Sequence, residues 1–227
     1  MRLSSYKNNF ILVLRYFHGI FEDILSIITN TECIVCGKYS RGKKLCDDCA
    51  KVIDQPPALT TKSIGNQQVF YFGFYEGRLR EFILAYKFKN HHSLSKSFAV
   101  MIQRTLEANN IEPDIITYVP ATNSAKRKRG YDHMRLIAKE LSRISQIPMV
   151  NAIKAVRETD QLKTDNRAEA VKGKYLLNAD SKWIEGKRVL IIDDVLTTGN
   201  TISETVKVLK KANPSKIYVC IVALNRG

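Results

Sequence analysis

Residues 189–201 decide the fold, and they read Val189-Leu190-Ile191-Ile192-Asp193-Asp194-Val195-Leu196-Thr197-Thr198-Gly199-Asn200-Thr201. The apolar run that opens this stretch predicts a strand buried on both faces, as in a parallel sheet. Two adjacent carboxylates, Asp193 and Asp194, follow the run, and ligands of open α/β sheets bind outside the carboxyl ends of the strands. A hydroxyl-rich turn then leads into a helix, which we expect over residues 200–211. The stretch therefore predicts a binding site at a strand-to-helix turn.

This turn has the chemistry of a phosphate and ribose site. Backbone N–H groups, threonine hydroxyls and a helix N-terminus suit a phosphate, and the two carboxylates suit a ribose diol or a divalent metal. We expect both carboxylates to face solvent, so that alanine at both positions would remove binding and keep the fold. A simple helix cap at Thr198, Asn200 or Thr201 would explain the turn, but not two carboxylates that end an apolar strand. The Gly-x4-Gly-Lys-Ser/Thr pattern of P-loop nucleotidases does not occur.

Strands alternate with helices in the rest of the chain, which predicts an α/β fold with an open, mainly parallel sheet. Further strands are expected over residues 68–75, 114–119, 152–156 and 216–224, and further helices over residues 78–88, 93–108 and 131–145. The basic segment 120–130 is predicted to be a loop. The polar segment 157–173 lacks apolar periodicity, and we expect a mobile connection there.

The N-terminal part carries a second pattern, with apolar side chains at three- and four-residue steps over residues 10–28. This spacing predicts an amphipathic helix that packs on the protein, with a membrane-surface helix as the alternative. Charged residues interrupt it too often for a spanning helix or a signal peptide. Pro56 and Pro57 mark a boundary, so we expect an N-terminal part over residues 1–55 and a main domain over residues 56–227.

Four cysteines, Cys33, Cys36, Cys46 and Cys49, form a Cys-x2-Cys-x9-Cys-x2-Cys pattern. Two such pairs supply the four thiolates of a closed structural Zn²⁺ site, with no position left for catalysis. Two redox motifs or an iron–sulfur cluster are the alternatives. The fifth cysteine, Cys220, lies in an apolar strand and is expected to be a small buried side chain.

The composition is that of a globular protein, with 44% hydrophobic and 26% charged residues. The charge is unusual, because 36 Lys and Arg residues outnumber 22 Asp and Glu residues and give a net charge of +14. Such an excess favours a polyanionic partner: nucleic acid, a phosphorylated ligand or an anionic membrane. The clustered cysteines and the lack of a signal peptide favour a cytoplasmic protein.

Residues 189–201 resemble the phosphoribosyltransferase signature for 5-phosphoribosyl-1-pyrophosphate (PRPP). Two other segments resemble conserved blocks of the ComF family of competence-associated, phosphoribosyltransferase-like proteins. One contains Val119-Pro120 and Lys126-Arg127-Lys128-Arg129-Gly130-Tyr131-Asp132-His133, and the other runs from Tyr75 to Lys89. With the four-cysteine knuckle, the resemblance covers the chain from about residue 30. Asn90 and Ala170 depart from the family pattern, the second within a hood-like loop that looks shortened.

The resemblance implies a type I phosphoribosyltransferase-like fold and a role for each site residue. Asp193 and Asp194 would hold the ribose hydroxyls with Mg²⁺, and the five residues from Thr197 to Thr201 would hold the 5-phosphate. The pyrophosphate would meet a basic group, to which Arg129 brings positive charge near a strand end. This group comprises Lys87, Lys89, Arg127, Arg129 and Gly130.

The resemblance also implies a function in natural transformation, in which the protein binds PRPP and handles single-stranded DNA. A competence DNA helicase and recombination-mediator proteins would be its partners. Exposed aromatics would stack on bases, although we expect the candidates to lie mainly in the core; these are Phe70, Tyr71, Phe72, Phe74 and Tyr75. No catalytic side chain is identified.

An active phosphoribosyltransferase that releases pyrophosphate is the alternative function. Few residues follow the last expected strand to form a nucleobase pocket, so we favour the binding protein. A PRPP-sensing transcription regulator is a third, weaker hypothesis, because no helix-turn-helix pattern is visible.

Overall fold

The computed structural model describes residues 32–156 and 173–226. The helix expected over residues 10–28 and the polar segment 157–172 lie outside these ranges. The described chain forms two compact units, which divide between Val52 and Ile53. No helix in the described ranges has the length and apolar content needed to span a membrane.

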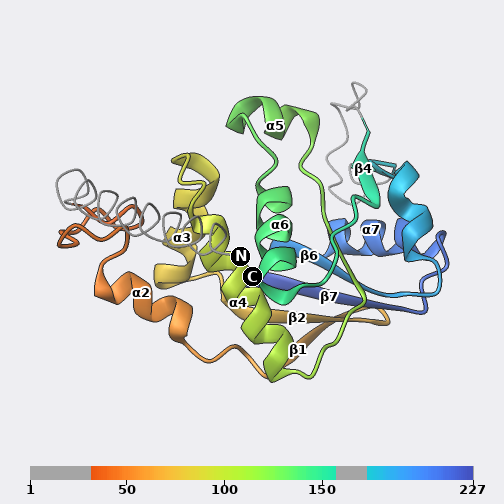
Figure 1. Ribbon diagram of the computed structural model, residues 1–227, viewed down its shortest axis with the longest axis horizontal. Coiled ribbons are helices and arrows are strands. Elements are labelled where there is room, and N and C mark those ends of the chain that lie inside the picture. The colour runs from red at the N-terminus through yellow and green to blue at the C-terminus, as the bar shows by residue number, and fades with distance from the viewer. Residues whose placement is uncertain (1–31, 157–172, 227) are drawn as a thin grey trace, which may run out of the picture. The chain divides into compact units, whose positions relative to one another are not determined.

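The larger unit is built on a five-stranded sheet with the order β1-β2-β7-β6-β3 (Figure 1). Its strands are β1 (Thr61–Ile64), β2 (Gln67–Phe74), β7 (Lys216–Leu224), β6 (Arg188–Leu196) and β3 (Ile115–Tyr118). The last four run parallel, and β1 is antiparallel to β2. The prediction of an open, mainly parallel sheet is confirmed.

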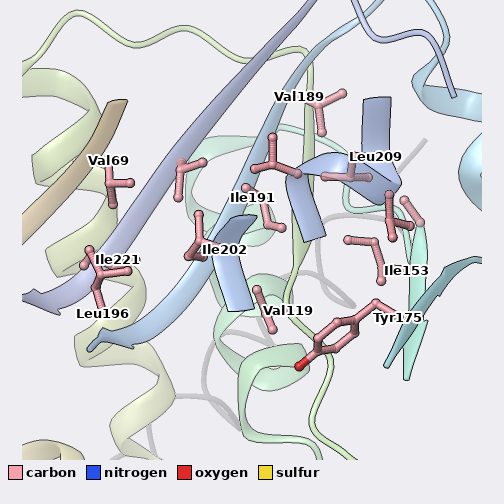
Figure 2. Close-up of a cluster of buried hydrophobic side chains, with 14 of the residues drawn as sticks. Val69, Val119, Ile153, Tyr175, Val189, Ile191, Leu196, Ile202, Leu209 and Ile221 are labelled. Carbon is pink, nitrogen blue, oxygen red and sulfur yellow. The ribbon is translucent and has the colours of Figure 1, made fainter. Parts of the chain in front are cut away.

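Helices cover both faces of this sheet, which explains the continuous apolar run of β6. The helices α3 (Gly77–Phe88), α4 (Leu94–Ala108) and α6 (His133–Ser145) precede β6, and α7 (Asn200–Lys210) follows it. Both α4 and α6 contact sheet strands on one face. On the other face Ile191 of β6, Ile202 of α7 and Ile221 of β7 belong to one buried cluster (Figure 2).

The basic segment after β3 corrects the predicted loop, because residues 123–129 form a helix, α5 (Asn123–Arg129). The Thr122 hydroxyl caps it by accepting a hydrogen bond from the N–H of Ala125, and Gly130 ends it with a φ of +80°. A cap and a left-handed glycine suffice to define a short helix. None of its residues is buried, so it lacks the apolar periodicity that reveals a helix in a sequence.

The other elements are short. The expected strand near residue 153 is β4 (Ile153–Ala155), which pairs with β5 (Tyr175–Leu177) in a separate two-stranded sheet, and η2 (Ala179–Ile184) is a 3-10 helix. Three of the four β1 residues are exposed, so that strand shows no apolar alternation. The helix α2 (Asp47–Asp54) includes Cys49 of the cysteine cluster.

Candidate functional site

The sheet has four parallel strands, β2, β7, β6 and β3, and their carboxyl ends lie at the same edge. At this edge β3 ends before β6 does, and the last bond between them joins the N–H of Val119 to the carbonyl of Ile192 at 3.0 Å. Asp193 and Asp194 come next in β6 and lie beyond the end of β3. A carboxyl edge of this kind is where open α/β sheets bind ligands.

Asp194 is buried, with 7% of its surface exposed. Its Oδ2 lies 2.8 Å from the Nζ of Lys87 and 2.6 Å from the Nε2 of His133. Burial opposes ionisation, but the charge of Lys87 and the hydrogen bond to His133 hold the pKa of Asp194 well below its usual range. The prediction that both carboxylates face solvent is therefore wrong for Asp194, because this side chain turns into the protein to meet two donors.

Asp193 lies on the other face of β6, since successive side chains of a strand alternate. It is partly exposed, and its Oδ1 accepts a hydrogen bond from the N–H of Asp194 at 2.9 Å. Burial and the neighbouring Asp194 carboxylate raise the pKa of Asp193. A bound cation would relieve this repulsion between the two groups.

Each of the two carboxylates keeps one oxygen without a partner in the described part of the chain, namely Oδ2 of Asp193 and Oδ1 of Asp194. Carboxylate oxygens of this kind suit a sugar diol or a hard cation such as Mg²⁺. The arrangement can therefore bind a ligand that carries a sugar diol or a divalent cation.

The sequence gives no reason to single out His133, which lies at the end of the basic segment and joins this cluster only in the folded protein. Its Nδ1 lies 3.0 Å from an Nη1 of Arg129, and its backbone carbonyl accepts a hydrogen bond from the hydroxyl of Tyr86 at 2.7 Å. Its contact with Asp194 joins residues 61 positions apart. No local spacing in the sequence signals such a contact.

The turn after β6 has the geometry of an anion site. Thr197 and Thr198 are exposed, and Gly199 precedes α7 with a φ of +80°. No side chain caps α7, which argues against the simple cap as the reason for this sequence. The first N–H groups of α7 thus have no side-chain acceptor, and a helix N-terminus in this state attracts anions.

Gly199 also lies close to the side chain of Ile64 in β1. A Cβ at this position would lie 2.8 Å from Cδ1 of Ile64 in β1. The turn therefore requires glycine both for its φ and for the close approach of β1.

The basic residues predicted for pyrophosphate divide into two groups. Lys87 and Arg129 meet around Asp194 and His133, and Arg129 also lies 5.7 Å from the ring centre of Phe88. Lys89 and Arg127 are exposed, and no ion pair of either is found within the described ranges. Gly130 ends α5.

The cysteine cluster lies in the smaller unit. The four Sγ atoms of Cys33, Cys36, Cys46 and Cys49 lie within 4.8 Å of one another, with 3.7 Å between those of Cys36 and Cys46. Tetrahedral Zn–S bonds of about 2.3 Å place sulfur atoms about 3.8 Å apart, so the cluster fits a structural zinc ion.

The thiol pKa values are consistent with this fit. Although burial opposes ionisation, backbone N–H groups of Cys36, Cys46 and Val35 lower the pKa of Cys33 to about 7. Burial and the neighbouring thiols raise the pKa of Cys49. A cation at the centre would favour all four thiolates.

Comparison with known proteins identifies a domain match and several relatives. Residues 128–227 match the phosphoribosyl transferase domain. Competence protein F of Haemophilus influenzae is 26% identical over 208 residues, which cover 86% of this chain and 91% of that protein. Orotate phosphoribosyltransferase of Xylella fastidiosa is 38% identical over 86 residues, which cover 35% of this chain and 37% of that enzyme.

Among solved structures, the purine phosphoribosyltransferase of Pyrococcus horikoshii aligns with a TM-score of 0.38 and 21% identity. The alignment covers 58% of this chain and 74% of that enzyme. The domain match, together with the mainly parallel sheet, confirms the predicted phosphoribosyltransferase-like fold class.

Proposed function

The chain is a homologue of competence protein F with a phosphoribosyltransferase domain, and we propose that this domain binds PRPP with Mg²⁺. The observation that carries the proposal is the pair of carboxylates on β6, each with one oxygen that has no partner in the described ranges, followed by the uncapped N-terminus of α7. In this proposal Asp193 and Asp194 hold the ribose hydroxyls and the metal. The residues from Thr197 to Thr201 hold the 5-phosphate.

The pyrophosphate of PRPP needs positive charge on the same edge of the sheet. Lys87 and Arg129 supply it beside Asp194, and the exposed side chains of Lys89 and Arg127 can turn toward a bound anion. Gly130 offers a backbone without a side chain next to them. Charge-assisted hydrogen bonds to phosphate oxygens are the strong ones in proteins, so this group supports PRPP over an uncharged sugar.

Isothermal titration calorimetry with PRPP and Mg²⁺ tests this site. We expect saturable binding that is lost when EDTA removes Mg²⁺. Ribose 5-phosphate should bind more weakly, because it lacks the pyrophosphate. An absence of heat with Mg²⁺ and PRPP would overturn the proposal.

We further propose that the protein handles single-stranded DNA in natural transformation, with a competence DNA helicase and recombination mediators as partners. The similarity to competence protein F supports a role in competence, and the charge of +14 supports binding of a polyanion. Of the five aromatic candidates, Tyr71 and Phe72 are buried as expected of core residues, whereas Phe70, Phe74 and Tyr75 are only partly buried.

Other aromatic side chains near the carboxyl edge pair with arginine and can stack on bases. Phe74 lies 3.5 Å from the guanidinium of Arg226, measured to the ring centre. Phe88 is 60% exposed and lies beside Arg129. A single strand of DNA could therefore contact arginine side chains and aromatic rings together at this edge.

Binding of a labelled oligonucleotide at several salt concentrations tests the DNA proposal. We expect the affinity to fall steeply with salt, because phosphate contacts release counterions. Phe88→Ala should weaken binding by about fivefold, the loss of about one stacked base. Trp183 is the matched control, since it is 61% exposed and its ring centre lies 5.2 Å from the Nζ of Lys182. It lies near the opposite end of β6, so Trp183→Ala should change DNA binding little. Equal effects of the two variants would contradict this surface.

An active phosphoribosyltransferase is the second candidate, favoured by the match to orotate phosphoribosyltransferase. In that case the protein would transfer phosphoribosyl from PRPP to an acceptor and release pyrophosphate. Incubation with PRPP, Mg²⁺ and a panel of nucleobases, followed by a pyrophosphate assay, decides between the two. Pyrophosphate release that depends on one base would favour the enzyme over the binding protein.

A further inference from the structure

We infer that His133 is a positioning residue of the carboxyl-edge site, one that holds Asp194 so that Oδ1 stays turned toward the ligand. This inference rests on the proposed binding of PRPP and adds a residue outside the strand-to-helix turn. It is carried by three hydrogen bonds that meet at the His133 ring and the Asp194 carboxylate.

The His133 ring is fixed in place by two helices. His133 is 6% exposed and is the first residue of α6. The Asp132 carboxylate caps this helix by accepting a hydrogen bond from the N–H of Arg135. The Tyr86 hydroxyl of α3 donates to the backbone carbonyl of His133. Both α3 and α6 therefore define where the imidazole lies.

The neighbour of Nδ1 determines how the ring is protonated. A guanidinium has only donors, so Arg129 at 3.0 Å requires Nδ1 to accept. The proton of a neutral ring is then on Nε2, where it donates to Oδ2 of Asp194 at 2.6 Å. Arg129 thus acts on Asp194 through His133.

The consequence for Asp194 is that both of its donors act on the same oxygen. Lys87 and His133 approach Oδ2 from α3 and α6, which restricts rotation of the carboxylate. With His133 removed, Lys87 alone would hold the group, and a single flexible ammonium does not fix its orientation. Preorganised side chains bind a ligand better because they lose less entropy on binding.

Two variants separate hydrogen bonding from packing. In His133→Gln the amide has a donor for Asp194 and an acceptor for Arg129, whereas His133→Leu has neither. We expect His133→Leu to weaken binding of Mg²⁺ and PRPP by about tenfold to hundredfold, the range for a lost hydrogen bond to a charged group. His133→Gln should stay within about threefold of the natural protein. The melting temperature without ligand shows whether each variant is folded.

The outcomes are distinct. If the natural protein does not bind PRPP, the proposed function fails. If the natural protein binds and folded His133→Leu binds equally well, the positioning inference fails. It also fails if His133→Gln is as weak as His133→Leu, because ring packing would then explain both.

A measurement on the natural protein covers the case in which His133→Leu does not fold. Two-dimensional 15N NMR of the imidazole at pH 8 should show a proton on Nε2 and none on Nδ1. Arg129→Leu should relax this preference, while Arg127→Leu, in the same helix, should not. A neutral ring protonated on Nδ1 in the natural protein would overturn the inference.

Discussion

An aspartate pairs with a cation at each end of β6, and the two pairs differ in how many carboxylate oxygens have a hydrogen-bond donor. At the amino end Arg188 donates its backbone N–H to Oδ2 of Asp114 at 2.8 Å, and its guanidinium donates to Oδ1 at 2.8 and 3.2 Å. At the carboxyl end Lys87 and His133 share Oδ2 of Asp194. The first carboxylate has donors on both oxygens and the second on only one.

This difference separates a structural ion pair from a binding group. The Asp114 pair joins the start of β3 to the start of β6 and needs nothing further. Asp194 is the more buried of the two, yet it keeps an oxygen for something outside the protein. An incompletely paired acid at a buried position is costly unless a ligand completes it, and such groups cluster at functional sites. The predictions below are ordered by their effect on affinity for Mg²⁺ and PRPP.

The largest loss is expected when both carboxylates at the carboxyl end are neutralised. Asp193→Asn combined with Asp194→Asn removes the charges that would meet the metal and the diol, so calorimetry should show binding at least about hundredfold weaker. Asparagine is preferred to alanine because Asp194 is buried and its volume should be kept. Asp114→Asn is the matched control and should bind normally. Undiminished binding by the double variant would show that the site lies elsewhere.

An intermediate loss is expected at the glycine of the turn. Gly199→Ala combines a left-handed φ with a Cβ too close to Ile64, so we expect affinity about tenfold lower and stability about 1–2 kcal/mol lower in urea unfolding. Gly186→Ala is the control, because it shares the positive φ but meets no atom within 4 Å. It should cost stability without a change in affinity. If both variants bound PRPP equally, the close fit of the turn would be irrelevant to binding.

A third prediction concerns how the stabilisation from the Asp114–Arg188 pair, at the amino end of β6, depends on pH. Hydrogen bonds from the side chain and backbone of Arg188 hold the pKa of Asp114 at about 2, below its unfolded value of about 3.9. The folded state therefore binds this proton less readily, so the stabilisation is present above about pH 4 and is lost as the pH falls toward 2. Thermal unfolding from pH 7 to 2 should show a smaller loss of stability for Asp114→Asn than for the natural protein. Identical pH profiles would contradict the pair's role, and affinity for PRPP at pH 7 should not change.

Little effect on affinity is also expected from a change in the cysteine cluster. Cys33→Ser should reduce the zinc content measured by atomic absorption and destabilise the smaller unit, because structural zinc sites contribute folding free energy. The four cysteines lie outside the sheet domain, so binding of PRPP should remain within about twofold. A Cys220→Ser variant should keep its zinc, since that buried thiol lies in β7.

The apolar elements of the fold were predictable because each shows its burial as a periodic or continuous apolar pattern within its own segment of the sequence. The strand over residues 216–224 agrees with β7 at both ends, and the helix over residues 200–211 agrees with α7 within one residue. Elements that bury little were missed. The helix α5 buries none of its side chains, and β1 is an exposed edge strand held by pairing with β2, so neither has a periodic apolar pattern to detect.

The amino-acid order was enough to predict the α/β architecture, the four-cysteine cluster and the two carboxylates before a hydroxyl-rich turn, because each depends on residues close together in the chain. The strand itself is longer than expected, since β6 includes both carboxylates and continues to Leu196. The amino-acid order did not reveal that Asp194 turns inward, that His133 holds it, or that Arg129 acts on the imidazole. Those facts depend on α3, α6 and β6 meeting at one edge of the sheet. Packing alone brings residues so distant in the chain within hydrogen-bonding distance, and packing chooses which carboxylate oxygen stays open.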